Sequence, residues 1–404
     1  MPATQTLAAD AVSGLAIEDK DAFQAGRVAA VAAVHAVHDT YTGFLPPLLP
    51  AFIENLLLSR TEAGLLSVFM QGPSLLQPFI GHLADRVSLR YVLVLAPAVT
   101  TSLMSLLGVA PGYGVLALLL TLVGLSSAAL HAVAPVIAGG LSGAKLGRGM
   151  SFWMVGGELG RTLGPLVVVT AVGILGLRGM PWLMVLGLAA SLGLFVLLRD
   201  VPDYRPNGAE ALPWGAALRR MAPILAPLLV LIGARALVLM AVTTFLPTFL
   251  TEEGAGLWLA GAALSLLQGA GVVGALVGGS LSDRLGRRTI LICSGVLTPL
   301  LLFAFLASGG WGQFPLLLLL GFVLLSTTPA LMAMVQEGYP ESRALANGIY
   351  MAMGFVGQSV AVMAVGAMGD ALGLRPAFMV SGAIMLLSLP LVWRLPQGAR
   401  GAYR

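Results

Sequence analysis

Residues 279–288 read GSLSDRLGRR and residues 81–90 read GHLADRVSLR, about half the chain length apart. Gly, Leu, Asp and Arg recur at the same spacing in both stretches. Two further pairs keep nearly the same separation, namely TGFLPPLLPAF at 42–52 with TTFLPTFLTEE at 243–253, and GLR at 176–178 with GLR at 373–375. Three matched pairs with nearly one separation indicate that the chain consists of two repeats.

The residues around these repeated stretches are mostly apolar. The 404 residues are 58% hydrophobic and only 10% charged, with a mean hydropathy of +0.93. A soluble domain has about 25% charged residues, so this chain has too few to cover a surface that faces water. The 51 glycines suit the close packing of transmembrane helices. We therefore expect an integral membrane protein, and the net charge of +4 does not indicate a nucleic-acid partner.

A transmembrane helix needs about 20 apolar residues, and twelve stretches of the chain are long enough. We expect an all-α membrane protein with two six-helix bundles. The predicted spans are 28–53, 61–82, 91–109, 114–140, 149–174, 181–198, 221–249, 257–281, 289–308, 314–336, 344–368 and 376–394. The predicted domains are a segment at 1–27, bundles at 28–198 and 221–394, a linker at 199–220 and a tail at 395–404.

Lysine and arginine are distributed unequally between the two sides that this topology defines. Only Arg60, Arg178 and Arg375 fall on one side, and Arg161 and Arg235 fall inside spans. The rest of the 22 lie on the side that holds both termini. Because cytoplasmic loops carry the excess of positive charge, both termini are predicted to be cytoplasmic.

The loop at 279–288 resembles the signature loop of the major facilitator superfamily, and the duplicated spans extend this resemblance over the whole chain. The resemblance implies alternating access and a charge cluster that latches the cytoplasmic face; the alternative is that these charges only set the topology. In the first copy, Ser88 and Leu89 replace the Gly and Arg of the pattern. The predicted latch residues are Gly81, Asp85, Arg86, Gly279, Asp283, Arg284, Arg287 and Arg288.

The span VGGELGRTLGPLVVV has glycine at every fourth position, at Gly156, Gly160 and Gly164. Such a face permits close helix packing, and Pro165 is expected to bend the helix. The run resembles the Gly-x-x-x-Gly-Pro signature of drug–proton antiporters. Together with HAVHD, LLQPFIGHLADR and GLSSAALHAVAP, it also resembles the fosmidomycin-resistance family of bacterial exporters. The positions that match this family are His35, Asp39, His131, Gly156, Gly157, Gly164 and Pro165.

The first span carries three ionisable residues within five positions, His35, His38 and Asp39. A charge at the bilayer centre is unfavourable by several kcal/mol, so such groups usually pair or face a watery cavity. His35 and Asp39 are four residues apart and share one helical face, whereas His38 points elsewhere. We interpret the pair as a proton-binding site; the alternative is a structural polar contact between helices.

Three more charges lie inside predicted spans. Glu158 and Arg161 are three residues apart, so they either neutralise each other or divide proton exchange and anion binding between them. Arg235 has no acidic neighbour in sequence. It is expected to pair with Asp39 or Glu158 across the halves, or to bind a substrate carboxylate or phosphonate.

The remaining candidates are uncharged or rest on weaker patterns. His131 follows SSAAL and is either a packing residue or part of the substrate site. Gln71, Gln268 and Gln358 are weaker candidates for substrate binding. The single cysteine, Cys293, is expected to be a small buried hydrophobe.

These features predict a proton-coupled exporter of a small anionic or amphiphilic organic molecule in a bacterial inner membrane. Asp39, His35 and Glu158 are the predicted proton-coupling residues, and the protein is expected to be a monomer without metal or cofactor. No ATP site is expected, because the chain has no Gly-x-x-x-x-Gly-Lys-[Ser/Thr] loop. The alternatives are proton-coupled uptake of an organic anion and a membrane-embedded lipid-modifying enzyme.

Overall fold

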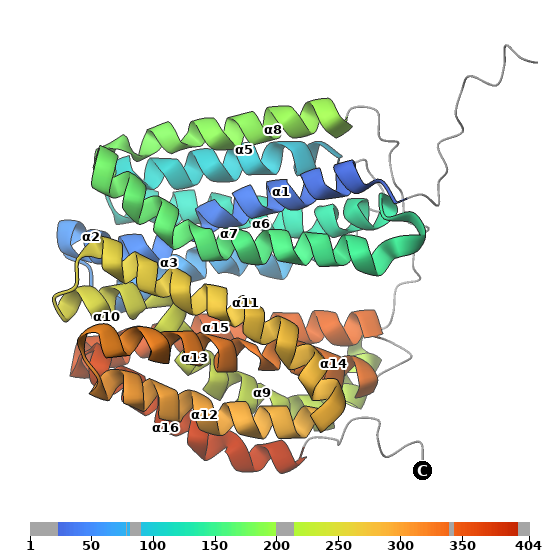
Figure 1. Cartoon of the computed structure of the whole chain (residues 1–404), viewed down its shortest axis with the longest axis vertical. Coiled ribbons are helices and arrows are strands. Elements are labelled where there is room, and N and C mark those ends of the chain that lie inside the picture. Colours follow the sequence, from blue (N-terminus) through green and yellow to red (C-terminus); the bar gives the residue numbers. More distant parts are fainter. Residues whose placement is uncertain (1–22, 78, 81–89, 199–213, 339–342, 395–404) are drawn as a thin grey trace, which may run out of the picture.

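The computed structural model of the chain describes residues 23–77, 79–80, 90–198, 214–338 and 343–394. Within these ranges all regular elements are helical, and Figure 1 shows them as two bundles stacked on one another. The first bundle contains α1 (Ala25–Thr42), α2 (Leu45–Leu56), α3 (Arg60–Gln71), η1 (Gly72–Leu76), α5 (Arg90–Leu106), η2 (Leu107–Val109), α6 (Tyr113–Gly140), η3 (Gly143–Lys145), α7 (Leu146–Leu175), η4 (Leu177–Leu183) and α8 (Met184–Leu198).

The second bundle repeats this order. It contains α9 (Trp214–Thr244), α10 (Leu246–Glu252), α11 (Leu257–Leu285), α12 (Arg287–Ala307), η5 (Gly310–Gly312), α13 (Gln313–Leu325), α14 (Thr327–Gly338), α15 (Arg343–Leu372), α16 (Leu374–Ser388) and η7 (Leu389–Arg394). Helix α9 begins within the range that the sequence assigned to the linker.

Ten stretches of the described chain are long and apolar enough to cross a membrane. The two other predicted spans each correspond to a pair of shorter elements, α1 with α2 and α3 with η1. The prediction of an all-helical, multi-pass membrane protein built from two bundles is therefore confirmed.

The repeated FLP sequence breaks a helix at the same place in each half. Phe44 precedes α2 and Phe245 precedes α10, and prolines occupy the first turn of both helices. A proline in the first turn loses no helical hydrogen bond, whereas its ring would clash with the turn before it. Both phenylalanines are fully buried in the cores of their halves.

The two halves approach each other through glycines. A Cβ added to Gly64 of α3 would meet Phe245 and the carbonyl oxygen of Val362 of α15 at 3.1 Å. On the opposite helix, a Cβ on Gly366 would lie 2.8 Å from the carbonyl oxygen of Arg60. The contact between α3 and α15 therefore depends on residues without side chains.

Polar contacts join the halves where α2 and α10 lie side by side (Figure 1). The Asp370 carboxylate accepts hydrogen bonds from the backbone N–H groups of Arg60, at 2.7 Å, and Thr61, at 2.9 Å, and from the Thr61 hydroxyl at 2.6 Å. The Arg60 guanidinium lies 2.8 Å from the carboxylate of Glu252 on α10. We call Arg60, Thr61, Glu252 and Asp370 the inter-half clasp.

The clasp closes the N-terminus of α3. Ser59 and Glu62 form a capping box that uses the N–H of Glu62. The N–H groups of Arg60 and Thr61 are the donors that such a box leaves without helical partners. Because Asp370 of the other half accepts from both, separating the halves here exposes two backbone donors.

Large apolar side chains remain exposed on the outer helices, as expected for surfaces that face lipid. The prediction for Cys293 was wrong, because this residue is exposed on α12. An apolar helix in a membrane does not have to bury its small hydrophobic residues, because lipid solvates them.

Candidate functional site

Helix α7 packs directly against α1 through its glycine repeat. A Cβ on Gly156, Gly160 or Gly164 would overlap the carbonyl oxygen of Ala32, Ala36 or Thr40, respectively. The contact advances by four residues on both helices, which is the small-residue packing that the sequence predicts. It brings the ionisable residues of α1 within reach of those on α7. Pro165 lies within α7, and its carbonyl oxygen faces Gly261 of α11.

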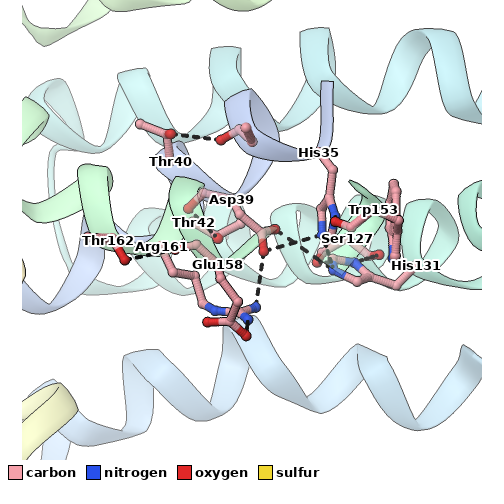
Figure 2. A network of polar contacts seen from close by, with 11 residues as sticks. His35, Asp39, Thr40, Thr42, Ser127, His131, Trp153, Glu158, Arg161 and Thr162 are labelled. Atoms are coloured by element: carbon pink, nitrogen blue, oxygen red, sulfur yellow. Dashed lines mark hydrogen bonds and ion pairs between the residues drawn. The ribbon is translucent and has the colours of Figure 1, made fainter. Parts of the chain in front are cut away.

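Two histidines and one aspartate meet beside this contact (Figure 2). His35 Nε2 lies 3.1 Å from His131 Nε2 on α6 and 3.4 Å from Asp39 Oδ2. His131 Nε2 lies 3.8 Å from Asp39 Oδ1. His35 and Asp39 are 3% exposed, and the His131 side chain is half-buried. We call His35, Asp39 and His131 the His–Asp cluster.

Arg161 connects the His–Asp cluster to a second acid. Its Nη1 donates to Asp39 Oδ2 at 3.1 Å, and its Nη2 donates to Glu158 Oε1. The side chains of Arg161 and Glu158 are 44% and 30% exposed, against 4% for Asp39. The guanidinium thus joins a buried carboxylate to one with open space beside it. The predicted Glu158–Arg161 pair is present, and Arg161 also pairs with Asp39.

Trp153 of α7 completes the surroundings of His35. Its indole ring stacks on the imidazole with the ring centroids 3.6 Å apart and 13° between the planes. Its carbonyl oxygen lies 2.9 Å from His35 Nδ1. Gly157, also on α7, leaves room for the imidazole, because a Cβ there would overlap the His35 ring. Sequence reasoning missed Trp153; its position four residues before Gly157, on the same helical face, was the available signal.

His38 is fully buried, and neither of its ring nitrogens has a hydrogen-bond partner within the described part of the chain. Its ring lies 5.8 Å from that of His131, edge to face. It therefore borders the His–Asp cluster from its own side of α1.

In the second half, Arg235 belongs to α9, and its side chain reaches a break in the tenth predicted span. It donates to the Thr327 and Thr328 hydroxyls at 3.0 Å each and to the Leu324 carbonyl oxygen at 2.9 Å. These groups surround Ser326, where α13 ends and α14 begins. The suggested pairing of Arg235 with Asp39 or Glu158 was wrong for this conformation, because Arg161 pairs with both acids. A pocket of about 40 Å³ adjoins Arg235.

The three glutamine candidates are half-buried on separate helices, Gln71 on α3, Gln268 on α11 and Gln358 on α15. Their role in substrate binding stays a prediction.

The loop at 279–288 lies at the end of α11. Gly286 has φ +95°, which a residue with a side chain rarely adopts, so glycine is needed for the turn into α12. Arg287 lies 2.6 Å from Asp283 and also binds Ser282, and Arg288 donates to the Trp393 carbonyl oxygen. Gly279 lies on α11, and a Cβ added to it would be 3.6 Å from the nearest atom of Pro329. Arg284 lies in the last turn of α11. The corresponding Gly81, Asp85 and Arg86 fall outside the described residues, so latching stays a prediction.

The His–Asp cluster also has the ligand types of a metal site, since its three ligand atoms lie within 4.8 Å of one another. It is the one such group in the residues that the structure describes. The Asp39 carboxylate is already neutralised by a guanidinium at 3.1 Å. The positive charge of Arg161 therefore opposes the binding of a divalent ion at this cluster.

Comparison with known proteins agrees with this architecture. The family model described as Major Facilitator Superfamily matches residues 31–361 and 270–402. The fosmidomycin resistance protein of Escherichia coli (strain K12) is 25% identical over 386 residues, which cover 90% of this chain and 91% of that protein.

Solved structures match at lower identity and so support the fold alone. A bacterial homolog of the human lysosomal transporter Spinster, in an inward-facing and occupied conformation, has a TM-score of 0.78 at 14% identity, covering 92% of this chain and 96% of that chain. A D-xylose–proton symporter has a TM-score of 0.69 at 17% identity, covering 94% and 99%.

Proposed function

The chain belongs to the Major Facilitator Superfamily, and from this premise we propose that it is a proton-coupled exporter of a small anionic or amphiphilic organic molecule. Membership makes it a secondary transporter with a small-molecule substrate rather than an enzyme. The matching halves would rock about a central site in alternating access. Export is supported by the similarity to the fosmidomycin resistance protein of a bacterium. Both termini would face the cytoplasm, because the side that holds them carries most of the Lys and Arg residues.

The link between Asp39, Arg161 and Glu158 is the observation that most strongly supports coupling between an anionic substrate and a proton. A mid-helix Arg and Glu that are partly exposed would be unfavourable in contact with lipid, so we assign them to the aqueous cavity between the halves. Arg161 would bind the anionic group of the substrate, while the His–Asp cluster behind it would bind the proton. Any change in the partner of Arg161 then alters the field at Asp39.

Arg235 would provide a second contact for the same substrate. Its guanidinium has no acidic partner among the described residues, so its positive charge is compensated only by neutral oxygens. An anion bound beside it would remove this imbalance, and a planar carboxylate or a phosphonate suits guanidinium geometry. His131, Gln71, Gln268 and Gln358 would contact the rest of the substrate.

The inter-half clasp supports an assignment of the conformation. The clasp includes Arg60, and Arg375 pairs with Glu253 next to the Glu252 of the clasp. The charge distribution places both arginines outside the cell. With this end closed, we infer that the structure represents the inward-facing state. Opening it would require Asp370 to leave the α3 N-terminus.

Proton-coupled uptake of an organic anion is the second candidate, and the charges at the site favour it in one respect. An anion that draws Arg161 away from Asp39 would leave the carboxylate without its guanidinium. The proton would then bind more tightly, so anion and proton would reinforce each other. Such coupling suits symport, whereas antiport needs competition between the two ligands.

The test is sided transport in proteoliposomes with an imposed pH gradient. Candidate compounds come from a thermal-shift screen of phosphonates such as fosmidomycin, other antibiotics, organic acids and lysolipids. An exporter accumulates the compound in inside-out vesicles when the vesicle lumen is acidic, and loses this ability without a gradient. Movement of compound together with protons would establish uptake instead, and flux independent of pH would refute proton coupling.

A further inference from the structure

The hydrogen bonds of the two histidines fix where their protons lie. His35 Nδ1 lies 2.9 Å from the carbonyl oxygen of Trp153, and His131 Nδ1 lies 2.8 Å from that of Ser127. A carbonyl oxygen only accepts, so both bonds require a hydrogen on Nδ1. The Ser127 hydroxyl also lies 3.3 Å from His131 Nδ1, a longer contact than that of the carbonyl oxygen, and accepts from the same N–H in this arrangement. In a neutral imidazole the other nitrogen then has a lone pair and no proton. Both Nε2 atoms would therefore be acceptors.

These two acceptors face each other across 3.1 Å, which is a hydrogen-bond distance. Two lone pairs at this distance repel, so the contact needs a proton on one of the nitrogens. We propose that His35 and His131 hold one proton between their Nε2 atoms, and that this is the proton the transport cycle carries. The second part rests on the proposed function; the first does not.

The surroundings stabilise one positive charge on this pair. Asp39 lies 3.4 Å from His35 Nε2 and 3.8 Å from His131 Nε2, so its carboxylate is the counter-ion of the shared proton. The face of the Trp153 indole lies against His35 and favours a cationic ring. Asp39 itself stays ionised, because it also accepts from Arg161 at 3.1 Å.

The site holds one proton and excludes a second. Protonating both Nε2 atoms would place two N–H groups and two cations against each other at 3.1 Å. The other ionisable groups around the pair are His38, next to His131, and Glu158, which reaches Asp39 only through Arg161. A further positive charge would meet the guanidinium as well as the first imidazolium.

The shared proton bridges separate helices. His35 belongs to α1 and His131 to α6, while Trp153 and Ser127 hold the two rings from α7 and α6. When the proton leaves to water, two lone pairs remain in contact, and one ring has to move away. Loss of the proton therefore loosens α6 from α1, which links proton release to movement of the helices.

The decisive experiment is nitrogen-15 NMR of histidine-labelled protein in lipid nanodiscs near neutral pH. The chain has four histidines, and the variants His38→Gln and His82→Gln each remove one signal and so assign the other two. We expect His35 and His131 to show protonated Nδ1 atoms and a scalar coupling between their Nε2 atoms through one proton. Unprotonated Nδ1 atoms, or two rings that titrate independently, would overturn the shared proton.

A transport measurement tests the second part separately. His131→Gln should lose accumulation driven by a pH gradient, and the flux of compound that remains should no longer depend on the lumen pH. If wild-type transport ignores pH, the proposed function fails, and the NMR result still decides the shared proton. If wild-type transport is proton-driven and His131→Gln remains so, the shared proton is not the one that the cycle carries.

Discussion

Replacing Asp370 by asparagine should open the end of the molecule that the inter-half clasp closes. The carboxylate accepts three hydrogen bonds, from the N–H groups of Arg60 and Thr61 and from the Thr61 hydroxyl, at 2.6–2.9 Å. Asparagine keeps one acceptor oxygen and loses the negative charge beside Arg60. Two of the three bonds use backbone N–H groups at the N-terminus of α3, where a negative charge is favoured.

The size of the effect follows from these bonds. A hydrogen bond to a charged group contributes about 1.5–3 kcal/mol. The Asp370 side chain is 29% exposed, so solvent screening supports the lower value. A loss of about 1.5 kcal/mol shifts the balance between closed and open states roughly tenfold.

Cysteine labelling measures this shift. Thr248 of α10 is 2% exposed beside a pocket of about 300 Å³ at the same end, so Thr248→Cys in a Cys293→Ser background reports opening. Labelling by a membrane-impermeant maleimide should become about tenfold faster in Asp370→Asn. The matched control is Glu253→Gln, since Glu253 pairs with Arg375 inside one half at 2.9 Å. An unchanged rate in Asp370→Asn, or an equal increase in the control, would refute the role of the clasp.

Three further predictions concern the packing of α7, the Asp39 carboxylate and the Arg235 guanidinium. Gly160→Ala places a Cβ about 2.9 Å from Asp39 Cβ, so it should lower stability by about 1–3 kcal/mol in thermal melts. The control is Gly173→Ala on the same helix, which has open space around the added Cβ and should leave stability unchanged. Equal losses in the two variants would contradict this packing. Asp39→Asn should abolish accumulation driven by a pH gradient with its melting temperature little changed; retained accumulation would contradict its coupling role. Arg235→Lys should weaken binding of an anionic compound about tenfold by calorimetry, because an ammonium lacks the planar fork; unchanged affinity would exclude substrate contact.

The sequence predicted the architecture because the relevant signals are local or repeated. Apolar stretches of sufficient length define the spans, and the FLP pair marks equivalent helix breaks before α2 and α10. The glycine period of four on α7 predicted a close contact. It did not identify α1 as the partner, since any helix with a face free of bulky side chains could pack against these glycines.

The candidate site was only partly predictable. The spacing of His35 and Asp39 placed them on one face of α1, but the rotation of α6 and α7 about their axes decides that His131 and Arg161 meet them. Arg235 binds the helix break at Ser326 and not an acid. This contact could not be predicted, because a backbone carbonyl group that is freed at a helix break gives no signal in the sequence. The Asp370 contact was equally hidden, since it joins segments of different halves.

The central claim is that a proton bound beside Asp39 drives movement of the substrate. The most direct test compares wild type with Asp39→Asn in proteoliposomes, using the compound with the largest thermal shift and monitoring its flux and the lumen pH together. We predict that wild-type protein moves protons in the direction opposite to the compound, in a fixed ratio, and that the variant exchanges the compound without proton movement. Equal proton movement in both proteins would contradict the claim.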